Sequence, residues 1–117
     1  MIRLTPETLA AAYDFLCTLP PYDGWNLPSS DDIKFIVTRS RTVYGSVDHF
    51  ADGAITVNIS GHLCKRIALL LATMAHELVH VHQFSACIMG RNRHDKTFQL
   101  LADEVCKHHP DFDRAVF

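Results

Sequence analysis

Apolar residues recur along the chain with two different periods, and these periods separate helices from strands. Thr5-Pro6 combines an N-cap hydroxyl with a proline of the first turn and is typical of a helix start. Helical spacing then continues through Leu9, Ala12, Tyr13 and Leu16. Pro20-Pro21 ends this N-terminal helix, and residues 20–31 are rich in Pro, Asp, Gly, Asn and Ser, which predicts a loop. The apolar Trp25 and Leu27 within this loop are expected to hold it to the core.

Three runs in the middle of the chain alternate apolar and polar residues, which predicts strands at 33–38, 42–50 and 54–60. Asp52-Gly53, between the last two runs, is a hairpin signal. We therefore expect a three-stranded, mainly antiparallel sheet. The run 54–60 either forms a sheet edge that receives an extended substrate or is an ordinary strand paired on both sides.

Two further helices are predicted in the second half. Residues 63–88 lack proline and glycine, and Gly90 with Arg91-Asn92-Arg93 should end this long helix. Its expected buried face consists of Ile67, Leu70, Leu71, Met74, Leu78, Val81 and Ile88. A C-terminal helix should begin near Asp95 and bury Phe98, Leu101, Ala102 and Val105. The pattern predicts an α+β fold, with residues 1–117 as a single domain.

Composition narrows the class of protein. Apolar residues make up 48%, charged residues 21%, and the net charge is −2, so no broad attraction for nucleic acid or anionic lipid is expected. No transmembrane run or signal peptide is apparent, and we expect a cytoplasmic protein without membrane partners. The 4 cysteines show no C-x-x-C pair, and Cys64, Cys87 and Cys106 are expected to be small buried hydrophobes.

Residues 76–80 read His-Glu-Leu-Val-His, the H-E-x-x-H pattern of zinc peptidases. A helix turns about 100° per residue, so His76 and His80 stand on one face and can hold one Zn²⁺ ion. Glu77 lies beside that face, close enough to act as the general base on a water without being a ligand.

A catalytic zinc ion usually has a third protein ligand. His94, just past the predicted helix break, is the first candidate, because a loop there can fold back over the metal face. Glu104 and Asp103, in the last helix, are the alternatives. For the group that stabilises the oxyanion, Tyr44, His49 and the arginines are all candidates, and no spacing argument separates them.

The order of these pieces over residues 33–98 resembles the SprT-like family of zinc metallopeptidases, which includes the Spartan proteases. The strand at 33–38, the small-residue strand at 44–47 and the strand at 55–60 precede H-E-x-x-H as in that family. The segment His94-Asp95-Lys96-Thr97-Phe98 is similar to the family's H-G-x-x-F, whose histidine is the third ligand. The resemblance implies a minimal zincin-like fold and that role for His94.

The chain also departs from the family. Asp95 stands where the family usually has glycine, and the cysteine-rich zinc ribbon and the DNA-binding extensions of Spartan have no counterpart. Nucleic acid is thus a partner only by family analogy. The expected function is a zinc metalloendopeptidase acting on a protein or peptide, with His76, His80 and His94 on the metal and Glu77 as catalytic base. A zinc-binding interaction or regulatory domain that cuts nothing, and a metal-free fold with an incidental motif, are the alternatives.

Overall fold

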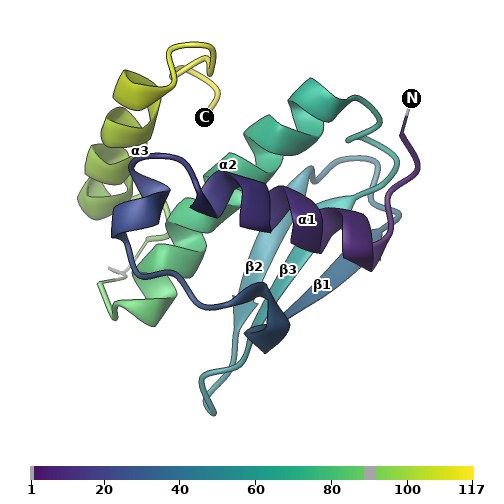
Figure 1. The fold of residues 1–117 in the computed structure, drawn as a ribbon, viewed down its shortest axis with the longest axis horizontal. Coiled ribbons are helices and arrows are strands. Elements are labelled where there is room, and N and C mark those ends of the chain that lie inside the picture. Colours follow the sequence, from purple (N-terminus) through teal and green to yellow (C-terminus); the bar gives the residue numbers. More distant parts are fainter. Residues whose placement is uncertain (1, 89–91) are drawn as a thin grey trace.

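The computed structural model describes residues 2–88 and 92–117, which form an α+β fold with three α-helices and a three-stranded mixed sheet (Figure 1). The predicted break at Gly90 lies outside the described residues. The elements follow one another as α1 (Pro6–Cys17), the 3₁₀ turns Tyr22–Gly24 and Ser30–Asp32, β1 (Ile33–Thr38), β2 (Gly45–His49), β3 (Ile55–Ser60), α2 (Ile67–Ser85) and α3 (Lys96–His108).

The sheet has the order β1-β3-β2, with β3 in the centre. β2 pairs with β3 in antiparallel register, whereas β1 pairs with β3 in parallel register from Ile33 opposite Ile55 to Thr38 opposite Ser60. The expectation of a mainly antiparallel sheet is therefore wrong, because the chain passes from β1 to the far edge before the hairpin returns it to the middle. Of the two possibilities for 54–60, the strand paired on both sides is the right one.

The hairpin between β2 and β3 turns at the predicted Asp52-Gly53. The Phe50 amide donates to the Ala54 carbonyl at 3.0 Å, and the Gly53 amide donates to the Phe50 carbonyl at 2.9 Å. Gly53 has φ of +88°, a left-handed conformation that a side chain would strain. Strand β2 itself spans only Gly45–His49, so it is shorter than the alternating run 42–50 that predicted it.

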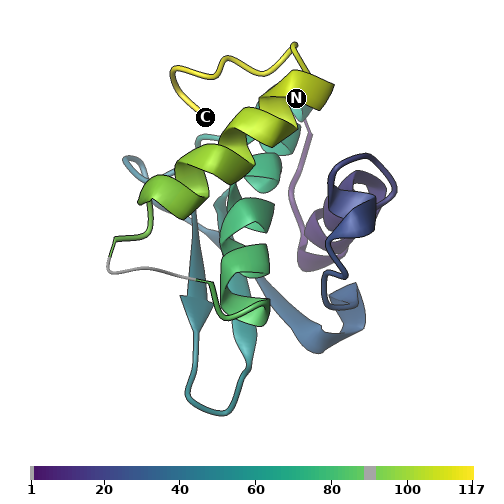
Figure 2. The ribbon, with the colours of Figure 1, turned by 90° about the vertical axis from the view of Figure 1, so that its left-hand side faces the viewer.

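Helices α1 and α2 cover the same face of the sheet, and α3 lies on the outer side of α2 (Figures 1 and 2). Thr5 caps α1 as predicted, since its side chain accepts a hydrogen bond from the Thr8 amide. The core between these layers includes Leu9, Tyr13, Val57, Ile59, Met74, Leu78 and Val81. Trp25 and Leu27 pack against it, as expected for the loop.

Helix α2 is shorter than the apolar pattern suggested, and the two outermost residues of its expected buried face are exposed. Ile67 is 61% exposed in the first turn and Ile88 is 40% exposed beyond the last, because neither is held over the core. Cys87, in the turn after the helix, is exposed rather than buried, while Cys64 is buried and Cys106 partly so. None of the described helices has the length and apolarity that crossing a bilayer requires.

Candidate metal centre

Helix α2 and the segment before α3 bring three histidines together. His76 and His80 stand one turn apart on α2, and His94 approaches them from the other side. One ring nitrogen from each lies within 4.8 Å of the others, and Nε2 of His94 is 3.3 Å from Nε2 of His76. Nitrogens bound tetrahedrally at about 2.0–2.1 Å from zinc would be about 3.3–3.4 Å apart, so this pair has the spacing of zinc ligands.

Phe98 provides the surface on which the three imidazoles meet. Its ring centroid lies 5.0 Å from that of His76, 4.9 Å from that of His80 and 4.7 Å from that of His94. Phe98 is only 1% exposed, so the core fixes its position. Asp95 caps the helix by accepting a hydrogen bond from the Phe98 amide at 3.1 Å, which places the start of α3 beside the histidines.

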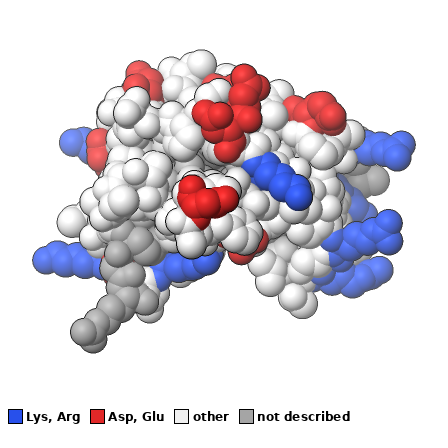
Figure 3. Space-filling model, turned by 90° about the horizontal axis from the view of Figure 1, so that it is seen from below, with Lys and Arg blue, Asp and Glu red and all other residues white. Residues whose placement is uncertain are grey.

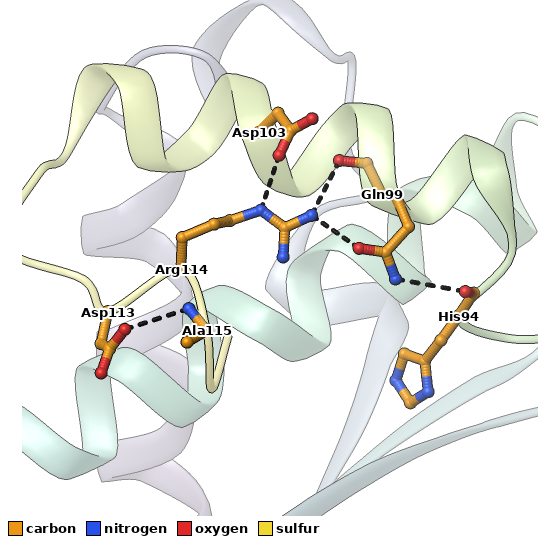
Figure 4. A network of polar contacts seen from close by, with 6 residues as sticks. All are labelled: His94, Gln99, Asp103, Asp113, Arg114 and Ala115. Carbon is orange, nitrogen blue, oxygen red and sulfur yellow. Dashed lines mark hydrogen bonds and ion pairs between the residues drawn. The ribbon is translucent and has the colours of Figure 1, made fainter.

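Three polar contacts orient His80 and His94 further. Nδ1 of His80 lies 3.1 Å from Oε1 of Gln83, which is fully buried three residues later. In the tautomer that donates this bond, Nε2 of His80 is left free for a metal. The backbone at His94 is held by Asn92, whose side chain accepts from the His94 amide at 2.9 Å, and by Gln99, which donates to the His94 carbonyl at 3.2 Å (Figure 4).

The electrostatics favour neutral imidazoles, the form that binds metal. Burial lowers the pKa of His76 to about 4, with His94 acting in the same direction and a backbone hydrogen bond to Phe117 opposing it. Burial also lowers the pKa of His80 to about 4, and the neighbouring His76 adds to the effect. Two unprotonated imidazoles can therefore accept a cation without first losing protons near neutral pH.

Glu77 lies next to this cluster and is 4% exposed. Burial raises the pKa of its carboxyl to about 8, although the positive charge of Arg93 acts in the opposite direction. A Cβ atom on Gly45 would stand 3.0 Å from Oε2 of Glu77, so the carboxylate packs against the backbone at the start of β2. A side chain at this position would press on the carboxylate, which would have to move by a few tenths of an ångström.

The alternative third ligands lie elsewhere. Asp103 is exposed and accepts an ion-pairing hydrogen bond at 2.7 Å from Nε of Arg114, and Glu104 is exposed on the same helix. Neither belongs to the group of possible ligands found among the described residues. His82 stacks on Trp25, with ring centroids 4.5 Å apart, and His49 stacks on Phe84 at 4.8 Å, so these histidines serve packing.

The positive charge of Arg93 lies close enough to act on both Glu77 and His80. Its Nη1 donates to the Val47 carbonyl at 2.8 Å, and its guanidinium carbon lies 5.5 Å from the centre of the Phe84 ring. It thereby ties the segment carrying His94 to the edge strand β2. Tyr44 lines a cavity beside Glu77, whereas His49 is occupied by its stacking.

Sequence reasoning overlooked the roles of Gln83 and of the C-terminal residue Phe117, whose ring lies 5.6 Å from that of His76. Gln83 carried a usable signal, since a polar residue three positions after His80 stands beside it on the helix. Phe117 carried none, because its contact depends on how the chain after α3 folds back.

Comparison with known proteins finds no matching family model, no similar curated protein and no similar solved structure. The geometry of the site and its chemistry therefore carry the functional argument alone.

Proposed function

We propose that the protein is a zinc-dependent metallopeptidase of the SprT-like, zincin type. The observation that carries this proposal is the convergence of His76, His80 and His94 beside the buried carboxyl group of Glu77. A set of three nitrogen ligands suits zinc and leaves a fourth position for water. The expected fold, with a sheet beside a helix that bears H-E-x-x-H, agrees with the α+β arrangement.

In this proposal the bound zinc supplies Lewis acidity, lowering the pKa of a water molecule and polarising the scissile carbonyl. Glu77 removes the proton as the water oxygen bonds to the carbonyl carbon. The same carboxyl then delivers the proton to the leaving nitrogen as the C–N bond breaks. Burial beside the ligands keeps this carboxyl group close to the position of the water.

The substrate strand is proposed to lie along β2, not along the central strand β3. Tyr44 accepts from the Ser60 amide, and this register points the backbone groups of Gly45, Val47 and His49 away from β3. Arg93 already occupies the Val47 carbonyl, so the freest stretch of this edge begins at Gly45, next to Glu77. An extended peptide could pair there through its main chain.

Nothing favours nucleic acid as the substrate. The net charge is −2, and on the face drawn in Figure 3 basic side chains at both sides and near the middle are interspersed with acidic ones. The alternative of a zinc-binding domain without catalysis shares the same ligands. It gives no reason for a buried glutamate beside them, because a structural site gains nothing from a general base.

Metal analysis and a cleavage assay test the proposal together. The parent chain should carry one zinc ion, and His76→Ala, His80→Ala and His94→Ala should each lose it, while Glu104→Ala serves as the matched control that keeps it. Glu77→Gln should keep the zinc and reduce hydrolysis of an unfolded protein by about 10²–10⁴-fold. Zinc loss in Glu104→Ala but not in His94→Ala would overturn the ligand assignment, and undiminished hydrolysis by Glu77→Gln would overturn the mechanism.

A further inference from the structure

A cavity of about 540 Å³ opens beside His76 and Glu77. Its walls come from three parts of the chain: Tyr44 lies just before β2, Leu69 lies on α2, and Phe112, Val116 and Phe117 follow α3. The lining thus includes the proposed base and a proposed metal ligand. The remainder is mainly apolar, with the acidic Asp113 also in the lining.

The wall supplied by the C-terminal segment is a fixed part of the molecule. Arg114 donates to Asp103 at 2.7 Å and to the side-chain oxygen of Gln99 at 2.6 Å, which clamps the segment to α3 (Figure 4). Phe112 stacks on Phe117, with ring centroids 5.7 Å apart, and Phe117 reaches the His76 ring. The same Gln99 also holds the His94 backbone, so the wall and the third histidine share one support.

We infer that this cavity binds a bulky apolar side chain of the substrate, adjacent to the bond that is cut. The inference rests on the proposed function, because the cavity next to Glu77 is a substrate site only if Glu77 acts as the catalytic base. A peptide paired with β2 from Gly45 onward would run beside the cavity, because Tyr44 and Gly45 both line it. Leucine- or phenylalanine-like side chains lose contact with water on entering this apolar cavity, whereas the carboxylate of Asp113 disfavours acidic side chains.

Zinc-binding hydroxamates test the inference without turnover. Three probes share one hydroxamate group and carry a methyl, an isobutyl or a benzyl substituent, and calorimetry on the zinc-loaded full chain measures their dissociation constants. We expect the isobutyl and benzyl probes to bind at least about tenfold more tightly than the methyl probe, since filling an apolar pocket with one or more methylene groups discriminates by about 10–200-fold.

Two exposed residues give a matched pair of variants. Val116 is 81% exposed and lines the cavity, whereas Leu100 is 61% exposed on α3 and does not line it. Val116→Asp should reduce the preference for the larger probes over the methyl probe, and Leu100→Asp should keep that preference. A fourth hydroxamate probe, which carries the side chain of glutamate as its substituent, should bind more weakly than the isobutyl probe.

Each outcome separates the cavity from the proposed function. Equal affinity for all three probes overturns the cavity assignment while the zinc site stands. A preference that Val116→Asp leaves unchanged also overturns it, because the apolar substituent then lies elsewhere. A parent chain without zinc, or one that binds no hydroxamate, overturns the proposed function and the inference with it.

Discussion

Gln83 contacts the proposed metal cluster through one hydrogen bond to His80. It is fully buried and its Oε1 lies 3.1 Å from Nδ1 of His80, while its amide nitrogen has no hydrogen-bond partner. Gln83→Met keeps the size of the side chain but removes the acceptor, and it should weaken zinc binding by about 10–100-fold. Gln83→Glu retains an acceptor oxygen and should restore most of the affinity.

Competition with a chromophoric chelator measures these affinities, and circular dichroism of the metal-free proteins checks that both variants are folded. If a folded Gln83→Met variant binds zinc as tightly as the parent chain, His80 keeps its tautomer without the hydrogen bond to Gln83.

Gly45 is a second residue whose importance lies in what it lacks. A Cβ there would stand 3.0 Å from both Oε2 of Glu77 and Cγ2 of Thr73. Gly45→Ala should displace the carboxylate, leave the zinc content unchanged and lower the rate of hydrolysis by about 10-fold or more, because small misplacements of a catalytic group are costly. Gly24→Ala is the matched control, since a Cβ at Gly24 meets nothing within 4 Å. Equal rates in the two variants would contradict the expectation.

At the scale of elements, the C-terminal segment is held to α3 mainly by Arg114. The side chains of Arg114 and Asp103 are 35% and 64% exposed, so the ion pair should contribute little to overall stability. Arg114→Ala should therefore leave the melting temperature nearly unchanged but raise amide hydrogen exchange in residues 112–117, because the bonds to Asp103 and Gln99 are both lost.

Lys107→Ala, which removes an exposed cation from the same helix, should not change that exchange. Unchanged exchange in Arg114→Ala would show that packing of Phe112 and Phe117 alone holds the segment.

The elements show where sequence reasoning is strong. The bounds of β1, the cap at Thr5 and the start of α3 at Asp95 follow from local period and chemistry, and the structure agrees with them. The H-E-x-x-H spacing is local too, whereas His94 was one choice among three until the fold brought it to His76. The parallel pairing of β1 and the cavity wall were beyond prediction, because both depend on contacts that no periodic pattern encodes.

At the scale of the molecule, the proposed zinc ion joins α2 to the segment before α3, which the chain otherwise connects through residues 86–95. A zinc ion that binds the folded state but not the unfolded state stabilises the folded protein, by about 2.7 kcal/mol when free zinc is 100 times the dissociation constant. We expect a chelator to lower the melting temperature by roughly 10 °C for a chain of this size. His94→Ala should abolish this response and Glu104→Ala should retain it. If the chelator leaves the melting temperature of the parent chain unchanged, zinc binding is contradicted.

The strand order also governs how the chain finds its fold. β2 and β3 are neighbours along the chain and close a short loop, whereas β1 must reach its place beside β3 across the whole intervening hairpin. Loop-closure entropy has to be overcome before distant pairings contribute, so we expect the hairpin to form in the folding transition state and β1 to dock later. In stopped-flow measurements, a substitution of Gly53 in the turn should thus lower the folding rate. Shortening the side chain of Ile33 in β1 should chiefly raise the unfolding rate.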